Sequence, residues 1–102
     1  MDDAVASRAF SALGNAHRVA ALRLLVQAGC DGLNVKALRE RLALPPTTMN
    51  HHLRALADAR LVVQERSGRE LVSRANYHHI RELAGFLMED CCRGVFGASV
   101  TD

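Results

Sequence analysis

The sequence predicts a mainly α-helical fold, with five helices and one small β-hairpin. Hydrophobic residues make up 49% of the chain and aromatic residues only 4%, and alanine and leucine, which dominate, are good helix formers. Apolar residues recur every three or four positions along most of the chain, as in amphipathic helices. One stretch, at about residues 61–75, instead has two strand-like runs around a glycine. A length of 102 residues predicts a single domain spanning 1–102.

The first two helices are expected at residues 2–13 and 16–28. Gly14 interrupts the helical pattern between them, and Asn15 is a good N-cap for the second helix. The residues expected to face the core are Val5, Ala9, Ala12 and Leu13 in the first helix and Val19, Leu22, Leu25 and Val26 in the second.

A helix-turn-helix is expected next. Asn34 caps a short third helix, whose buried side holds Val35, Leu38 and Leu42, and a turn over residues 43–45 follows. Pro46 suits the first turn of a fourth helix at about 46–59. Two short helices joined by so tight a connection, with the second presented outward, are typical of DNA-binding proteins.

The fourth helix has two chemically different faces. One face is largely apolar, with Met49, His52, Leu53 and Leu56. The other face has hydroxyl, amide, imidazole and guanidinium groups but no carboxylate, so it suits a DNA major groove, although an ordinary solvated face would have a similar composition. The residues expected to contact DNA from this face are Thr47, Thr48, Asn50, His51 and Arg54.

The β-hairpin is expected to consist of strands at 61–66 and 71–75, joined at Gly68. Its tip carries Arg66 and Arg69. A hairpin that follows a DNA-reading helix forms the wing of winged-helix proteins, where arginines at the tip reach a phosphate or the minor groove. The alternative for each arginine is a solvated position in a turn.

The last helix is expected at about 76–93, with Asn76 as its N-cap and Gly94 at its end. His78 and His79 are expected at the surface near its start. Its apolar seam, formed by Ile80, Leu83, Leu87 and Cys91, would pair with the same helix of a second subunit, or else pack on its own core. The first helix would share in such a dimer interface.

Charge and cysteine usage restrict the class of protein. Residues 34–74 hold eight Lys or Arg against four acids, a net +4, whereas the rest has five bases against seven acids, a net −2. A basic centre fits a DNA-facing surface.

The chain shows no apolar run long enough for a membrane span, no secretory signal and no motif of an enzyme. An odd number of cysteines, two of them adjacent, argues against a disulfide scaffold, so we expect a cytoplasmic protein.

These segments resemble the ArsR/SmtB family of bacterial metal- and metalloid-responsive repressors. The resemblance rests on residues 12–18, on 46–53 in the fourth helix, on 56–62 after it and on 66–69 at the hairpin tip. It implies a winged helix-turn-helix homodimer that leaves an operator of dyad symmetry when an inducer binds. It also implies that Thr48, Asn50 and His51 read the groove, with Thr47 and Arg54 near phosphates.

The sequence departs from the family at Arg60, where relatives usually have glycine. A residue other than glycine carries a conformational cost there if the backbone requires a positive φ.

The resemblance also restricts where an inducer would bind. The positions of one arsenical site are here Asn34 and Lys36, so that site is absent. The zinc-type positions on the last helix are Asn76, His78, Glu89 and Cys92, of which two are unsuitable ligands. The ending at 89–94 is similar to that of arsenical-responsive members whose thiols lie on the last helix, which implies that Cys91 and Cys92 bind As(III) or Sb(III).

Adjacent thiols suit a soft, thiophilic centre, but side chains of adjacent helical residues point about 100° apart, so joint binding requires a loosened last turn. Relatives have a third cysteine downstream that is absent here. Either Cys30 supplies the third sulfur, or Cys91 and Cys92 bind a monoalkylated arsenical whose carbon takes the third bond.

Other interpretations of the cysteines remain open. Cys30 taken alone would also fit the role of a small buried apolar residue. The Cys91–Cys92 pair would also fit a role in helix packing. Cys30 with Cys91 or Cys92 would also suit a repressor that responds to oxidants or sulfane sulfur. No permanently bound cofactor is expected in either case.

Overall fold

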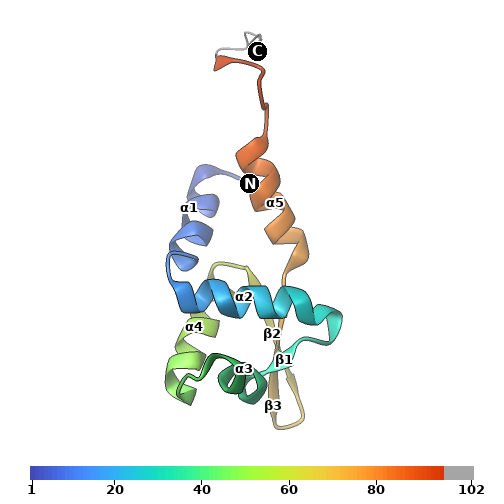
Figure 1. Ribbon diagram of the computed structural model, residues 1–102. Helices are drawn as coiled ribbons and strands as arrows, with labels where there is room; N and C mark the ends of the chain where they lie inside the picture. The colour runs from blue at the N-terminus through green and yellow to red at the C-terminus, as the bar shows by residue number, and fades with distance from the viewer. Residues whose placement is uncertain (96–102) are drawn as a thin grey trace.

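Five α-helices, one short 3₁₀ turn and a three-stranded sheet form the fold in the computed structural model, which describes residues 1–95 (Figure 1). The predicted mainly helical fold with a β-hairpin is therefore confirmed. The elements are α1 (Asp3–Ala12), α2 (Ala16–Ala28), η1 (Gly29–Asp31), β1 (Leu33–Asn34), α3 (Val35–Leu42), α4 (Pro46–Asp58), β2 (Val62–Ser67), β3 (Glu70–Ala75) and α5 (Tyr77–Met88).

Side-chain caps explain where most helices begin. The Asn15 side chain accepts hydrogen bonds from the backbone N–H groups of His17 and Arg18, at 2.9 and 3.2 Å. The Asn34 side chain accepts one from Ala37 at 2.8 Å, and Asn76 does the same at the start of α5. Each such cap contributes about 1 kcal/mol. The three asparagines expected to cap helices therefore do so.

Helix α4 lies at the centre of the core. Its buried residues are Met49, His52, Leu53 and Leu56, which are the residues expected on its apolar face. They meet Leu25 of α2, Leu38 of α3 and Leu61, all of them fully buried. Burial of a leucine side chain contributes about 1.5–3 kcal/mol. This packing fixes which face of α4 remains at the surface.

The buried stripe of α2 differs from the expected one. Val19 and Val26, predicted to face the core, are 39% and 41% exposed, whereas Ala21 is fully buried beside Leu22. Val19 and Val26 are seven residues apart and therefore lie on one side of the helix. The other elements pack against the opposite side of α2, around Ala21, Leu22 and Leu25. The side with Val19 and Val26 therefore stays partly open to solvent.

The hairpin of β2 and β3 is extended by β1 into an antiparallel sheet of order β1-β3-β2. Strand β1 was not expected, because two residues are too few to show alternation. It approaches β3 closely at Gly32, where an added Cβ would lie 2.3 Å from the backbone oxygen of Ser73. Gly32 also has a φ of +65°, so only glycine fits the entry to this strand.

Helix α5 is shorter than predicted. It ends at Met88 rather than near residue 93, and Asp90 and Cys92 have positive φ values of 58° and 62°. The last turn holds no basic residue, and two acids, Glu89 and Asp90, follow directly. Negative charge at a helix C-terminus opposes the helix dipole, which explains the early end. Leu87, expected in the apolar seam, is 61% exposed at this end.

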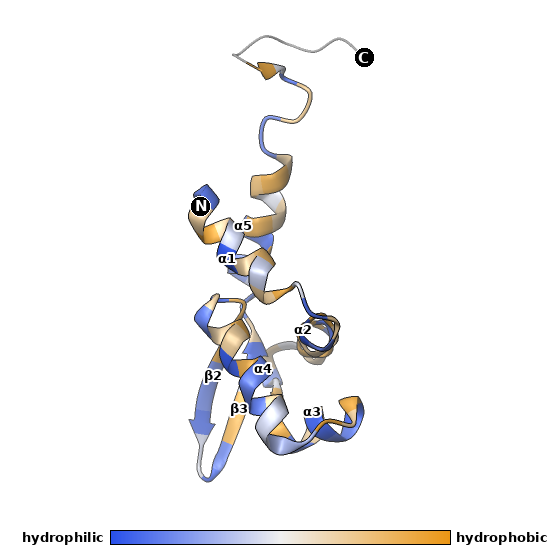
Figure 2. Cartoon of the chain, turned by 90° about the vertical axis from the view of Figure 1, so that its left-hand side faces the viewer, coloured by the Kyte–Doolittle hydropathy of each residue, from blue (hydrophilic) through white to orange (hydrophobic). Residues whose placement is uncertain are grey.

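Helices α1 and α5 lie at the end of the molecule away from the hairpin tip, and the hydropathy colouring shows the apolar end of α5 projecting from the body (Figure 2). None of the helices in residues 1–95 has the length and apolar character that crossing a bilayer requires.

Candidate nucleic-acid interface

The outer face of α4 presents the side chains expected to contact DNA. Thr47, Asn50, His51 and Arg54 are exposed, and Thr48 is partly exposed. The helix begins at Pro46, whose missing N–H would be unpaired in any first turn. The buried face opposite leaves this surface no freedom to turn inward. It holds donors and acceptors but no carboxylate, as predicted from the sequence.

A histidine and an arginine link α4 to α2 beneath that surface. The Arg18 Nε–H donates to Nδ1 of buried His52 at 3.2 Å. The ring centroids of His17 and His51 lie 5.8 and 6.0 Å from that of His52. Burial lowers the pKa of His52 below its ordinary value of 6.5, and the charges of Arg18, His17 and His51 lower it further. His52 is therefore a neutral acceptor that orients α4.

The hairpin and α4 meet at a hollow of about 370 Å³. It brings together Asn50, Arg66 and Arg69 of the predicted site residues and adds Lys36 from α3. Glu70 also lines it and accepts a hydrogen bond from the Asn34 side chain at 3.2 Å. Three cations against one acid make this a surface suited to a phosphate backbone.

The remaining predicted residues on α4 do not line this hollow. Sequence reasoning did not select Lys36, which lines this hollow, although its place two residues after the cap Asn34, in the basic centre of the chain, was a usable signal.

A strained residue ends the segment between α4 and the hairpin. Arg60 has a φ of 64°, so the cost anticipated for a residue other than glycine at this position applies. Its backbone oxygen accepts a hydrogen bond of 2.9 Å from the Asn76 side chain. That bond ties the start of β2 to the start of α5.

The two adjacent cysteines lie beyond α5 rather than on it, which corrects the expectation of a helical thiol pair. Both are exposed, and their sulfur atoms are 3.4 Å apart, well beyond the about 2.05 Å of a disulfide. The positive φ of Asp90 and Cys92 permits this approach, which a regular helix would not. The Arg93 Nη1 donates to Asp90 at 2.7 Å, so its charge is shared with a carboxylate.

Cys30 does not join this pair within one chain. It is exposed in η1, at the far end of α2 from α1, whereas Cys91 and Cys92 follow the projecting end of α5 (Figure 1). Across residues 1–95, no three His, Cys, Asp or Glu side chains are grouped closely enough to hold a metal ion. The downstream stretch without a third cysteine lies at 95–99, mostly outside the described residues.

The expectation of two surface histidines at the start of α5 is half wrong. His78 is exposed and pairs with Glu82 at 3.0 Å. His79 is 7% exposed, because it lies one turn before Leu83 on the buried face of α5. Its Nε2 has no hydrogen-bond partner within the described residues.

Comparison with known proteins decides the family. The family model described as a helix-turn-helix domain matches residues 13–65, just over half of the chain. The structure of an ArsR-like transcriptional regulator from Rhodococcus sp. RHA1 is 28% identical, with a TM-score of 0.69 over 82% of this chain and 76% of that one. This protein belongs to the helix-turn-helix domain family and is an ArsR-type regulator. The predicted resemblance is confirmed.

Two further solved structures support the fold of the regulator. A homodimeric winged helix-turn-helix DNA-binding domain from Mycobacterium bovis, Mb0332, described as a possible ArsR-family regulator, is 23% identical with a TM-score of 0.70, covering 93% of this chain and 91% of that one. NolR from Sinorhizobium fredii is 24% identical with a TM-score of 0.67, covering 93% and 87%. No curated protein sequence matches the regulator.

Proposed function

We propose that this ArsR-type regulator is a homodimeric repressor that binds an operator of dyad symmetry and leaves it when a trivalent arsenical or antimonite binds Cys91 and Cys92. Its membership of a DNA-binding regulator family supports the first half of the proposal. The sulfur pair supports the second half. The single observation that carries it is the 3.4 Å separation of two exposed sulfurs directly after α5.

DNA binding is assigned to the outer face of α4 and to the hairpin. Asn50 and His51 offer groups that can pair with base edges in the major groove, and Thr47, Thr48 and Arg54 lie beside them for bases or phosphates. Arg66 and Arg69 at the wing, with Lys36 between the two elements, would hold the phosphate backbone.

Dimerisation is assigned to α1 and α5. Phe10 on α1 and Leu87 and Met88 on α5 are large apolar side chains that are 41%, 61% and 65% exposed. Both helices lie at the end of the molecule away from the hairpin tip (Figure 1). Large exposed apolar side chains of this kind are typical of a protein interface. The homodimeric state of Mb0332, whose fold is similar, supports the same assembly here.

The thiol pair suits a trivalent arsenical. As(III) selects thiolate ligands, and sulfurs 3.4 Å apart can chelate one arsenic atom after a small adjustment. Two sulfurs complete the coordination of a monoalkylated or monoaryl arsenical, because its carbon takes the third bond. Inorganic arsenite would require a third sulfur. Cys30 is the third cysteine of the sequence, so Cys30 of the partner subunit is the candidate for this ligand.

Coupling between the two sites would run through the dimer. A ligand at the end of α5 changes how two protomers pack, and so changes the spacing of the two α4 helices. Release requires that the arsenical binds the DNA-free dimer better than the DNA-bound dimer, since linkage is reciprocal.

The test is operator release by phenylarsine oxide and by arsenite, with a duplex obtained by selection from a random pool. We expect Cys91→Ser combined with Cys92→Ser to bind this duplex as the wild type does and to ignore both arsenicals. Cys30→Ser is the matched control and should still respond to phenylarsine oxide. Normal arsenical-driven release from the double variant would contradict the sensing site.

The oxidant or sulfane-sulfur alternative gives a different result in the same assay. It predicts release by peroxide or persulfide, with a bridged or persulfidated cysteine in the mass spectrum and no arsenic adduct.

A further inference from the structure

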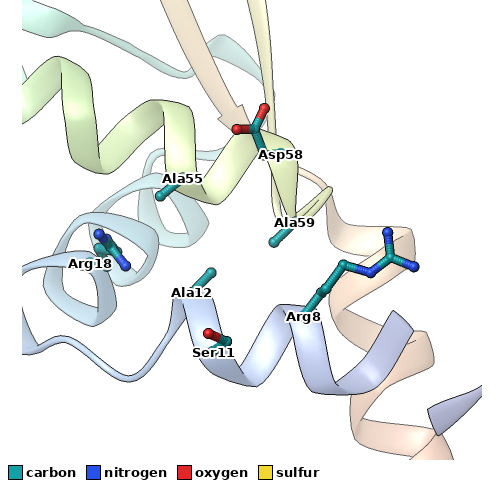
Figure 3. A pocket seen from close by; sticks show the side chains of 7 residues that line it. All are labelled: Arg8, Ser11, Ala12, Arg18, Ala55, Asp58 and Ala59. Carbon is teal, nitrogen blue, oxygen red and sulfur yellow. The ribbon is translucent and has the colours of Figure 1, made fainter. Parts of the chain in front are cut away.

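A hollow of about 220 Å³ lies where α1 meets α2 and the end of α4 (Figure 3). Its floor is apolar, because the methyl groups of Ala12, Ala55 and Ala59 all point toward its centre. At about 30 Å³ for each small group, this volume corresponds to roughly seven non-hydrogen atoms. This is the size of a small organic molecule rather than of a peptide.

The rim of the hollow is cationic. Arg18 stands at one side and Arg8 at the other, with the Arg8 guanidinium and the Asp58 carboxylate both pointing away from the centre (Figure 3). Arg60 lines an adjoining small hollow together with Arg8 and Asp58, so three arginines and one aspartate lie around the two hollows. No ion pair within residues 1–95 neutralises any of these arginines.

Arg18 carries donors that the protein itself does not use. Its Nε–H donates to His52, but within the described residues its terminal nitrogens donate to no protein acceptor. The side chain is half-buried and lines the hollow. This guanidinium is held in place through one nitrogen and lines the hollow with two others unused. Such a group can bind a carboxylate through two parallel hydrogen bonds.

We propose that this hollow binds a small monocarboxylic acid with a compact apolar body, such as an aromatic acid. The carboxylate lies on Arg18, with Arg8 adding attraction from the opposite side, and the apolar body covers the three alanine methyls. This site is separate from the thiols and from the outer face of α4.

The hollow remains accessible in the proposed dimer. On α1, Phe10 is two residues from both Arg8 and Ala12, which places it about 200° around the helix from them. An interface through Phe10 therefore leaves this side of α1 uncovered.

The test is a titration of the arsenical-free, DNA-free protein with benzoate, followed by amide chemical shifts. We expect saturable shifts at Ala12, Ala55 and Ala59 with a Kd of about 1 mM or below, and no such shifts with benzamide, its neutral analogue. Because the test uses neither DNA nor arsenic, its failure is distinct from failure of the proposed function.

Variants locate the site. Ser11 lines the hollow from an exposed position on α1, so Ser11→Leu should fold normally, fill the space and abolish benzoate binding. Arg18→Gln should weaken binding about tenfold or more, and Asp58→Asn should strengthen it. Arg23→Gln, on the outer side of α2, is the control that leaves it unchanged. Equal shifts with benzamide, or full binding to Ser11→Leu, would overturn the proposal.

Discussion

The buried His52 makes the stability of the protein depend on pH in a specific direction. Its pKa is lowered in the folded state, by burial first and then by Arg18, His17 and His51, so the folded protein resists protonation there. The unfolded chain takes up the proton near pH 6.5. The unfolded state therefore binds more protons below that pH, and stability falls as pH decreases from about 6.5 toward the lowered pKa. Above 6.5 the contribution is complete.

The size of this effect follows from the contact that protonation breaks. A protonated His52 can no longer accept the 3.2 Å hydrogen bond from Arg18, and it places a second cation beside that guanidinium. A hydrogen bond to a charged group contributes about 1.5–3 kcal/mol. For a domain of this size, a loss of 1 kcal/mol lowers Tm by about 4–8 °C.

Urea unfolding at pH values from 7.5 to 5.0 measures this effect. Wild type and His52→Gln, which keeps an acceptor that does not titrate, should differ in slope over this range, with wild type losing stability more steeply. His51→Gln removes only the smallest of the charges that lower the pKa of His52, so its curve should stay close to that of wild type. Parallel curves for wild type and His52→Gln would refute the role given to the Arg18–His52 contact.

Two further predictions concern the backbone and the wing. Arg60→Gly should raise the free energy of unfolding by about 0.5–1 kcal/mol, because relief of a positive φ outweighs the extra entropy of glycine in the unfolded chain. Ala57→Gly, within α4, is the control and should lower the free energy of unfolding by about the same amount. An Arg60→Gly variant that is less stable than wild type would contradict this reasoning. Arg69→Gln should weaken DNA binding on every sequence alike and reduce the slope of log K against log salt by about 2 for a dimer, since each lost phosphate contact removes about 0.9. An unchanged salt slope would remove Arg69 from the interface.

Much of the fold was predictable because local signals agreed with the packing. The asparagine caps at 15, 34 and 76, the glycine at the hairpin tip and the two faces of α4 each depend on residues within a few positions of one another. Local chemistry decides such features, and the structure confirms them.

The errors over α2 and His79 share one physical cause, which is contact between distant segments. Whether Val19 and Val26 or Ala21 faces the core depends on where α3, α4 and β3 press against α2, and no pattern within α2 reveals that. The burial of His79 likewise depends on how α5 meets the body.

The candidate sites divide in the same way. Residues on one face of α4 could be selected from their spacing, and so could the arginines of the hairpin tip. The link from Arg18 to His52 spans 34 positions, and Lys36 reaches the wing only through the fold. The approach of the Cys91 and Cys92 sulfurs depends on where α5 ends. The sequence predicted that end near Gly94, whereas the helix ends at Met88.

The most direct measurement of the central claim is a map of amide chemical-shift changes when a short DNA duplex is added at low salt. We predict that the largest changes fall on residues 47–54 of α4 and 66–70 of the hairpin, while α1 and the exposed end of α5 change little. Changes concentrated on α1 and α5, with α4 and the hairpin tip unaffected, would contradict the account.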